Sequence, residues 1–392
     1  MSAELPAPRQ YRVLMIVSNM KQYRVEFYHQ LYIALAAHGV ALKVLYSRSK
    51  PSVLVRNDDS NLSPNVGQLI PATYLAGARA LLQFPPIRDV LTADYLIVVQ
   101  ANSILMNYIY VLLSRLGLKK VAFWGHGWNR QADVTSFGER FKRFILRQVD
   151  WWYAYTYRTE EHLIDSGFSA SSITVIDNAI DTEGFRRMLD DISDSGVEYF
   201  QQENALAPTD IVGIYCGALD DVKRIPFLLD CAKEISKRMT HFKLLVVGAG
   251  LLRPLVEELA KTNQAIRYLG PRFGVEKALC FRVARVFVHP GAIGLGILDA
   301  FAAGLPVITS AACAHGPEID YLVDGNNGLM VDGGVSEFTR AVEGILVSER
   351  ELSRMSASAL ASGRRYTLEN MVANVGRGVC SSLGLEIQTN EF

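Results

Sequence analysis

The chain has 392 residues, of which 49% are hydrophobic and 20% charged, a composition typical of a globular protein. Its 40 Lys and Arg residues are balanced by 40 Asp and Glu residues, so net charge gives no argument for nucleic acid as a partner. The five cysteines have neither C-x-x-C spacing nor nearby histidines, which disfavours a zinc site and a disulfide framework and fits a reducing cytoplasm. A chain of this length favours two domains, because single cores rarely grow so large.

Strand and helix patterns alternate from the start of the chain. An apolar run at 12–18 predicts a strand, an amphipathic run at 25–39 predicts a helix that ends at a glycine, and 41–47 predicts a second strand. This βαβ pattern indicates a parallel sheet. Further strands are predicted at 95–100, 119–125, 151–156 and 172–178. We therefore expect an N-terminal, acceptor-side Rossmann-like domain over 1–186.

The polar segment after Asp181 predicts a helix followed by a linker that includes Pro208, and we place the linker at 187–208. A second alternating series follows it. We expect a C-terminal Rossmann-like domain over 209–366 and a helix within 367–392 that packs back on the N-terminal domain. The expected architecture is α/β, with two doubly wound domains. Open sheets of this kind bind ligands beyond the carboxyl ends of their strands, so two such sheets facing each other predict a ligand between them.

One predicted strand-to-helix turn carries a single charge in an apolar run. The segment 289–310 reads HPGAIGLGILDAFAAGLPVITS, and Asp299 is its only Asp, Glu, Lys or Arg. The amides of Gly294, Leu295 and Gly296 would face an anion at the start of the helix, and Asp299 could accept hydrogen bonds from sugar hydroxyls. The alternative is a buried helix in which Asp299 makes a structural hydrogen bond.

A second turn places two cations after a predicted strand. Gly217 begins the turn, and Lys223 and Arg224 precede an apolar helix. Two cations at such a turn could stabilise a leaving diphosphate without a metal. The alternative is a solvated pair on a surface loop.

In the first domain, His126 follows a predicted strand and lies between two glycines. Such a histidine is either an active-site residue or a packing residue. Nearby Asn129 and Arg130 are candidate acceptor contacts. Lys21 and Arg24, in the first turn of the chain, are weaker candidates for phosphate or acceptor binding.

Three segments resemble the retaining glycosyltransferases of family 4, which have the GT-B fold. The run 286–330, with GLGILDAFAAGLPVIT and HGPEIDYLVDGNNGLMV, is similar to the family's nucleotide-sugar segment. The run 215–232, YCGALDDVKRIPFLLDCA, is similar to its glycine-x-leucine-x3-lysine segment, and 175–185 to its inter-domain hinge. The sequence departs from the family signature Glu-x7-Glu, because Gly291 and Asp299 hold those positions. Ala218 stands where the family has an arginine.

The resemblance implies a role for each candidate residue. Asp299 would hold the donor ribose, Lys223 and Arg224 the diphosphate, and His126 the transferred sugar. The loop with Arg272 and Phe273 would contact the base. Glu318 would supply a further carboxylate of the donor site.

The expected function is retaining glycosyl transfer from a nucleotide diphosphate-sugar to a glycan or lipid-linked acceptor in polysaccharide synthesis. We expect no cofactor or metal, and a cytoplasmic protein. The basic, apolar segment 140–158 is a candidate for peripheral contact at the inner membrane surface. The alternative is an ordinary helix that covers the sheet with its charges in solvent. Two alternatives are a sugar-nucleotide 2-epimerase of the same fold and a non-catalytic sugar-nucleotide-binding subunit.

Overall fold

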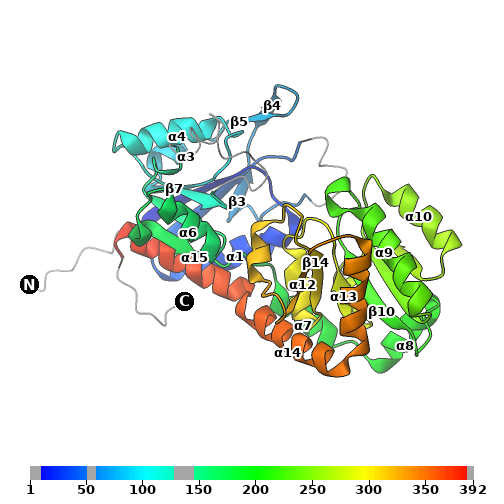
Figure 1. The fold of residues 1–392 in the computed structure, drawn as a ribbon. Helices are drawn as coiled ribbons and strands as arrows, with labels where there is room; N and C mark the ends of the chain where they lie inside the picture. The colour runs from blue at the N-terminus through cyan, green and yellow to red at the C-terminus, as the bar shows by residue number, and fades with distance from the viewer. Residues whose placement is uncertain (1–9, 51–58, 128–144, 386–392) are drawn as a thin grey trace, which may run out of the picture. The chain divides into compact units, whose positions relative to one another are not determined.

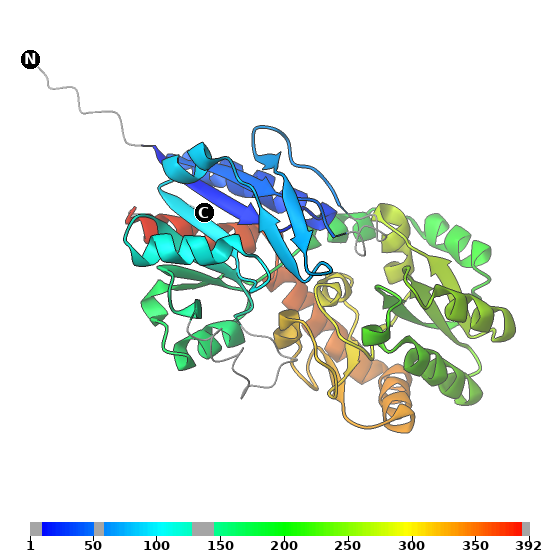
Figure 2. The same cartoon turned by 90° about the horizontal axis from the view of Figure 1, so that it is seen from above.

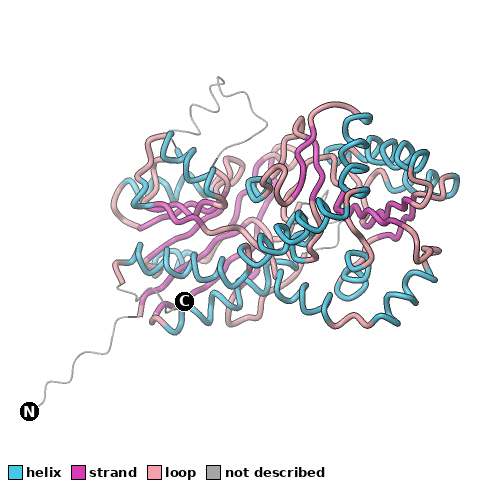
Figure 3. Tube along the Cα trace, turned by 60° about the horizontal axis from the view of Figure 1, so that its bottom comes forward, coloured by secondary structure: helices cyan, strands magenta, loops and turns pink. Residues whose placement is uncertain are grey.

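The computed structural model describes residues 10–50, 59–127 and 145–385 and divides into two compact units. Unit 1 consists of Met1–Asn178 with Leu368–Phe392, and unit 2 of Ala179–Thr367. In each unit, parallel strands form a layer between helices (Figure 1, Figure 3). The predicted α/β fold with two Rossmann-like sheets is confirmed.

Within the described part of unit 1, seven strands form one parallel sheet in the order β3-β2-β1-β6-β7-β8-β9. The order reverses between β1 and β6, which gives the doubly wound topology. Its strands are β1 (Tyr11–Val17), β2 (Val40–Tyr46), β3 (Gly67–Leu69), β6 (Tyr95–Val99), β7 (Lys120–Gly125), β8 (Trp151–Ala154) and β9 (Ile173–Val175). Helices α1 (Gln22–Ala37), α3 (Ile87–Thr92), α4 (Met106–Arg115), α6 (Tyr157–Asp165) and α15 (Leu368–Leu383) belong to this unit.

The sequence did not predict β3 or the hairpin formed by β4 (Ala72–Leu75) and β5 (Ala80–Gln83). These strands have only three or four residues, too few for an alternating pattern to be recognised. The long predicted strands, in contrast, are buried almost throughout, as the sequence LMIV of β1 shows.

Helix α15 completes unit 1 with residues from the far end of the chain. It packs against α1, β8 and β9, and lies beside α1 in Figure 1. Lys120 donates a hydrogen bond from its ammonium to the carbonyl of Ser382. Gly378 allows the closest approach, because a Cβ there would lie 2.6 Å from Thr174 Oγ1 and 2.8 Å from Tyr153 Cε1.

Within the described part of unit 2, six strands form a parallel sheet in the order β12-β11-β10-β13-β14-β15. The switch point lies between β10 and β13. The strands are β10 (Ile211–Cys216), β11 (Phe242–Val247), β12 (Ile266–Gly270), β13 (Val286–Val288), β14 (Val307–Ser310) and β15 (Gly328–Val331). The helices are α7 (Thr182–Asp190), α8 (Asp194–Glu203), α9 (Ile225–Arg238), α10 (Arg253–Thr262), α11 (Gly274–Arg282), α12 (Gly296–Ala302), α13 (Val335–Val347) and α14 (Glu349–Arg365).

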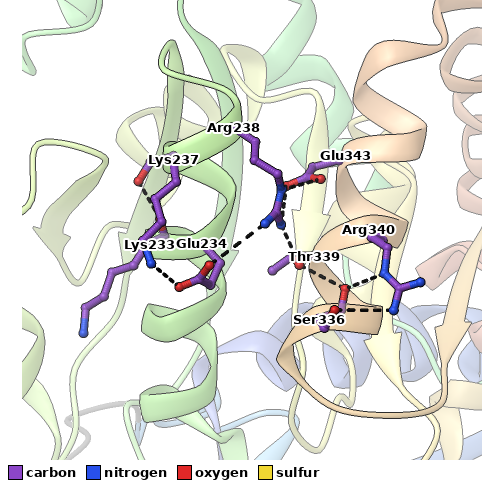
Figure 4. Close-up of polar contacts among 9 residues, drawn as sticks. Lys233, Glu234, Lys237, Arg238, Ser336, Thr339, Arg340 and Glu343 are labelled. Atoms are coloured by element: carbon purple, nitrogen blue, oxygen red, sulfur yellow. Dashed lines mark hydrogen bonds and ion pairs between the residues drawn. The ribbon is translucent and has the colours of Figure 1, made fainter.

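Helices α9 and α13 are joined by both apolar and polar contacts. Arg238 Nη2 lies 2.8 Å from Glu343 Oε1 and donates to Thr339 Oγ1 at 3.0 Å (Figure 4). The Phe227 and Phe338 rings of the same two helices meet edge to face, with centroids 5.5 Å apart. Phe338 and Thr339 are fully buried, so both the ring pair and the hydrogen bond to Thr339 contribute to this packing.

The predicted linker over 187–208 is wrong. Most of this segment forms the end of α7 and all of α8, which pack against α11 of unit 2. Both helices have side-chain N-caps: Asp181 accepts from the Gly184 amide at 2.7 Å, and Ser193 from the Gly196 amide at 3.2 Å. The polar composition that suggested a linker comes from these caps and from the exposed faces of two short helices. Unit 1 accordingly ends at Asn178, earlier than the expected boundary at 186.

Figure 2 views the sheet of unit 1 from a second direction, with helices on both of its faces. None of the helices in the described residues combines the length and the apolar character needed to cross a bilayer.

We predict that Gly378→Ala destabilises unit 1 by about 1–3 kcal/mol, because the added methyl overlaps Thr174 and Tyr153. The matched control is Gly344→Ala in α13, where no atom lies within 4 Å of the place that an added Cβ would take, so alanine should be neutral or stabilising. Urea unfolding of both variants measures the difference. Equal stability of the two variants would show that α15 does not pack as described.

Candidate functional site

The turn after β10 carries the two cations that the sequence singled out. Lys223 closes a short 3₁₀ turn, Asp221–Lys223, and Arg224 leads into α9. Arg224 has a φ of 54°, in the left-handed region that a residue with a side chain seldom adopts. Such a conformation costs on the order of 1 kcal/mol and persists where its surroundings fix it.

Hydrogen bonds connect this turn to the carboxyl ends of two other strands. The Lys223 ammonium donates to the carbonyl of Ala292, in the loop after β13. The Arg224 guanidinium donates to Ser310 Oγ at 2.9 Å, at the end of β14, and lies 4.0 Å from the centre of the Phe227 ring. The two cations therefore lie at the sheet edge where open parallel sheets bind ligands.

Gly291 packs directly against the backbone of the same turn. A Cβ at this position would lie 2.2 Å from the carbonyl carbon of Lys223 and 2.3 Å from its Cα. The amide of Ala292 donates to the Val222 carbonyl at 2.9 Å and holds the two loops together. Position 291 has no room for a side chain while the Lys223 turn keeps this course.

Glycines also let the turn after β10 approach the turn after β11. A Cβ at Gly248 would lie 1.9 Å from the carbonyl oxygen of Gly217, and one at Gly250 would lie 2.5 Å from that of Leu219. Gly217 itself donates its amide to the Val247 carbonyl at 3.0 Å. The predicted donor-site residue Gly217 thus has a packing role at the strand ends.

His289, which the sequence analysis did not select, directly follows β13. Its ring stacks on Tyr215 with centroids 5.0 Å apart. Burial, together with the nearby Lys223 charge, lowers the pKa of His289 to about 3, so the ring is neutral at neutral pH. Nδ1 faces the Gly291 carbonyl at 3.3 Å and therefore carries the proton. The signal in the sequence was a histidine between a strand and a Pro-Gly pair.

Asp299 lies in α12, and its carboxylate pairs with a lysine that the sequence analysis missed. Lys277 Nζ lies 2.7 Å from Asp299 Oδ2, and the side chains are 22% and 11% exposed. Burial by itself would lower the pKa of Lys277, but the Asp299 carboxylate outweighs this effect and raises the pKa above its ordinary value. Lys277 is therefore charged at neutral pH. A lysine within an apolar helix pattern was the available sequence signal.

Glu318 lies beside the glycine turn that leads into α12. It is 4% exposed, and its Oε2 would lie 3.6 Å from a Cβ at Gly294. Leu295 and Gly296 continue into α12, which spans seven residues. The structure thus brings together the predicted carboxylate and the predicted turn.

His315, another residue that the sequence analysis missed, fixes the same loop. The Ile293 amide donates to His315 Nδ1 at 3.2 Å, so Nε2 carries the proton and donates to the Ser310 carbonyl at 2.7 Å. One neutral ring therefore connects the end of β14 to the loop after β13.

Arg272 and Phe273 lie at the end of β12, and the sheet order places them two strands away from β10. Phe273 is 64% exposed. Arg272 Nη1 lies 3.2 Å from Glu276 Oε2, and within the described chain its buried Nε has no hydrogen-bond partner. The exposed ring is available for stacking.

His126 lies at the carboxyl edge of the unit 1 sheet, directly after β7. The flanking Gly125 and Gly127 have positive φ angles of 156° and 73°. The His126 ring centre is 5.6 Å from that of Tyr155, which follows β8 and accepts a hydrogen bond from Trp124 Nε1 at 2.9 Å. His126 therefore belongs to an aromatic cluster at a ligand-binding edge.

Lys21 and Arg24 both have partners within unit 1. Lys21 Nζ lies 2.7 Å from Asp59 Oδ1. Burial would raise the pKa of Asp59, but hydrogen bonds from Lys21 and Ser49 lower it below its ordinary value. Arg24 donates to Asn178 Oδ1. If either cation bound an acceptor, it would have to do so while also binding its partner within unit 1.

The predicted acceptor contacts Asn129 and Arg130 lie outside the described residues.

Comparison with known proteins finds a family model for part of unit 2. Residues 210–348 match the family model described as glycosyl transferases group 1. No curated protein sequence matches the chain. The matched segment contains Lys223, Arg224, Lys277, Asp299 and Glu318.

Solved structures of low sequence identity share the whole fold. HepE from Anabaena, solved in complex with UDP, has a TM-score of 0.68 at 14% identity, covering 94% of this chain and 100% of its own. Sucrose-phosphate synthase from Thermosynechococcus elongatus has a TM-score of 0.68 at 16% identity, covering 95% and 99%. A Listeria monocytogenes protein described as a UDP-N-acetylglucosamine 2-epimerase has a TM-score of 0.63 at 12% identity, covering 98% and 100%. The chain has the GT-B fold, as predicted, and residues 210–348 of its second unit are similar to group 1 glycosyl transferases.

We predict that Gly291→Ala destabilises unit 2 by about 1–3 kcal/mol, because the methyl group overlaps the Lys223 backbone. Gly294→Ala is the matched control, since its nearest neighbour would be Glu318 Oε2 at 3.6 Å, an ordinary contact. Thermal and urea unfolding compare the two variants. If Gly291→Ala is no less stable than Gly294→Ala, the described packing of the two loops is incorrect.

Proposed function

We propose that this chain is a retaining glycosyltransferase that moves a sugar from a nucleoside diphosphate to an acceptor hydroxyl. The observation that carries the proposal is the Lys223–Arg224 turn within the segment matched to group 1 glycosyl transferases. The described partners of Arg224 are the Ser310 hydroxyl, the Cys313 thiol and the Phe227 ring, and none of these is anionic. An anionic ligand would therefore gain the charge of Arg224 without displacing a carboxylate.

In the proposed reaction, the bond between the anomeric carbon and the diphosphate oxygen breaks as the acceptor oxygen bonds to the same face of that carbon. Lys223 and Arg224 stabilise the negative charge that develops on the leaving diphosphate. A diphosphate oxygen takes the acceptor proton, so no protein base is needed. Because the two cations balance this charge, the proposal includes neither a cofactor nor a metal.

The remaining candidates would position the donor. Asp299 would accept from the ribose, and the exposed Phe273 ring with Arg272 would contact the base. Glu318, beside the Gly294–Gly296 turn, would contact the phosphate-sugar portion. We propose that His126 contacts the transferred sugar.

We predict that Lys223→Ala lowers turnover about a hundredfold or more, on the order of 3 kcal/mol, because the leaving charge loses a cation. The control is Lys233→Ala, which removes a surface cation of α9 paired with Asp230 at 3.3 Å and should leave turnover unchanged. The donor is first identified by thermal shift with UDP-, GDP- and ADP-linked sugars. Near-normal turnover of a folded Lys223→Ala variant would remove the proposed diphosphate role.

A 2-epimerase is the second candidate, favoured by the fold shared with the Listeria monocytogenes protein described above. Incubation with the donor alone separates the two activities, because an epimerase yields an isomerised sugar nucleotide without any acceptor. A non-catalytic binding subunit would bind the donor but neither isomerise nor transfer its sugar.

We further propose a glycan or lipid-linked acceptor in polysaccharide synthesis, with cytoplasmic, peripheral contact at a membrane surface. Exposed apolar side chains on α3 and α4 support this contact. They are Ile87, Leu91, Ile109, Leu112 and Leu116. Ile109 and Leu112 on α4 and Leu116, directly after the helix ends, recur at intervals of three and four residues and so lie along one side. Lys119 Nζ donates to the Leu91 carbonyl at 2.5 Å and connects the end of α3 to the segment after α4.

We predict that the protein co-sediments with vesicles containing anionic lipid, and that Leu112→Glu with Leu116→Glu lowers the bound fraction several-fold, because charges replace exposed apolar contacts. Glu substitutions at the exposed Val347 and Leu251 of unit 2 serve as controls. Equal binding of all variants would contradict the assignment of this surface.

A further inference from the structure

The Lys277–Asp299 pair is a partly buried ion pair of unit 2 that no sequence motif indicated. It joins α11 to α12, the two helices that flank β13 in the chain. Helix α12 begins beside Cys216, the last residue of β10, because a Cβ at Gly296 would lie 3.8 Å from the Cys216 carbonyl oxygen. Burial raises the pKa of the Cys216 thiol to about 11, and Lys277 opposes this increase while Asp299 adds to it. The pair therefore lies near the end of β10, on the ligand-binding edge.

Two aromatic rings lie close to the Lys277 ammonium. Lys277 Nζ lies 4.9 Å from the centre of the Phe185 ring and 5.8 Å from that of Phe281. Its side chain is 22% exposed, so the lysine is only partly covered by protein. An ammonium has three N–H donors, and one is used on Asp299 Oδ2. The carboxylate in turn has a second oxygen.

A carboxylate alone offers a ligand only hydrogen-bond acceptors. The pair offers one acceptor, Asp299 Oδ1, and one charged donor, Lys277 Nζ, within reach of a single group. Two neighbouring hydroxyls match this pattern, since one can donate to the carboxylate while the other accepts from the ammonium. The vicinal diol of a ribose has this arrangement.

We propose that Lys277 is a specificity-determining residue that binds the donor ribose together with Asp299. The inference rests on the proposed function, because it assumes a nucleoside diphosphate donor held by Asp299. Lys277 also keeps the Asp299 carboxylate in place and neutralises its charge near the diphosphate. A purely structural pair would stabilise α11 against α12 but would not distinguish ribose from deoxyribose.

The test is a calorimetric titration with UDP, GDP and ADP and with the 2′-deoxy form of each. We expect the intact protein to prefer one ribonucleotide over its deoxy form by roughly tenfold to a hundredfold, the loss expected for one hydrogen bond to a charged group. Lys277→Met should reduce this preference to less than about threefold. Lys277→Arg, which keeps the charge and donor capacity, should restore part of it.

Two controls make the outcomes distinct. Lys223→Ala should weaken ribo and deoxy forms alike and leave their ratio unchanged. If Lys277→Met fails to fold because Asp299 is left unpaired, Lys277→Gln keeps a neutral donor for Asp299 without the charge, and the preference should fall in that variant. A folded variant that retains the full preference overturns the inference while the proposed function stands. Failure of all three ribonucleotides to bind overturns both.

Discussion

The close approach of Gly291 to the Lys223 backbone is the constraint on which the candidate site depends. Two loops from different strands meet there without a side chain between them, and the Ala292 amide and carbonyl each bind the opposite turn. This contact fixes where the Lys223 ammonium lies relative to the end of β13. A glutamate at position 291 and the present course of the 222–224 turn are mutually exclusive, because both would occupy the same volume.

The charges of the candidate residues in the two units fall into two kinds. Lys21 and Lys277 are balanced by Asp59 and Asp299, each at 2.7 Å, whereas the described partners of Arg224 are uncharged. The ring of His289 is kept neutral by burial, so it adds no further positive charge next to Lys223. Among the described partners of Arg224 there is no carboxylate, so this guanidinium could stabilise the diphosphate of the proposed donor.

Both units are built on a parallel sheet, but they differ in how many segments of the chain form them. Unit 2 is continuous, while unit 1 is completed by α15 after the chain has passed through unit 2. The glycine at position 378 lets this distant helix approach β8 and β9 closely. Unit 1 cannot be fully packed until the C-terminal helix is available.

The sequence by itself determined the α/β class and the strands β1, β6, β10 and β11. It also determined the turns that hold His126, Lys223 and Asp299. Hydrophobic periodicity and the glycines and prolines that end an element are properties of neighbouring residues, so they can be recognised without the structure. The sequence analysis wrongly placed a linker at 187–208, because two short helices with polar faces have the same composition as a linker. Only the tertiary structure decided that Lys277 pairs with Asp299, that His289 is neutral, and that Gly291 faces a backbone. These facts depend on atoms distant in sequence, and no local pattern specifies which of them meet.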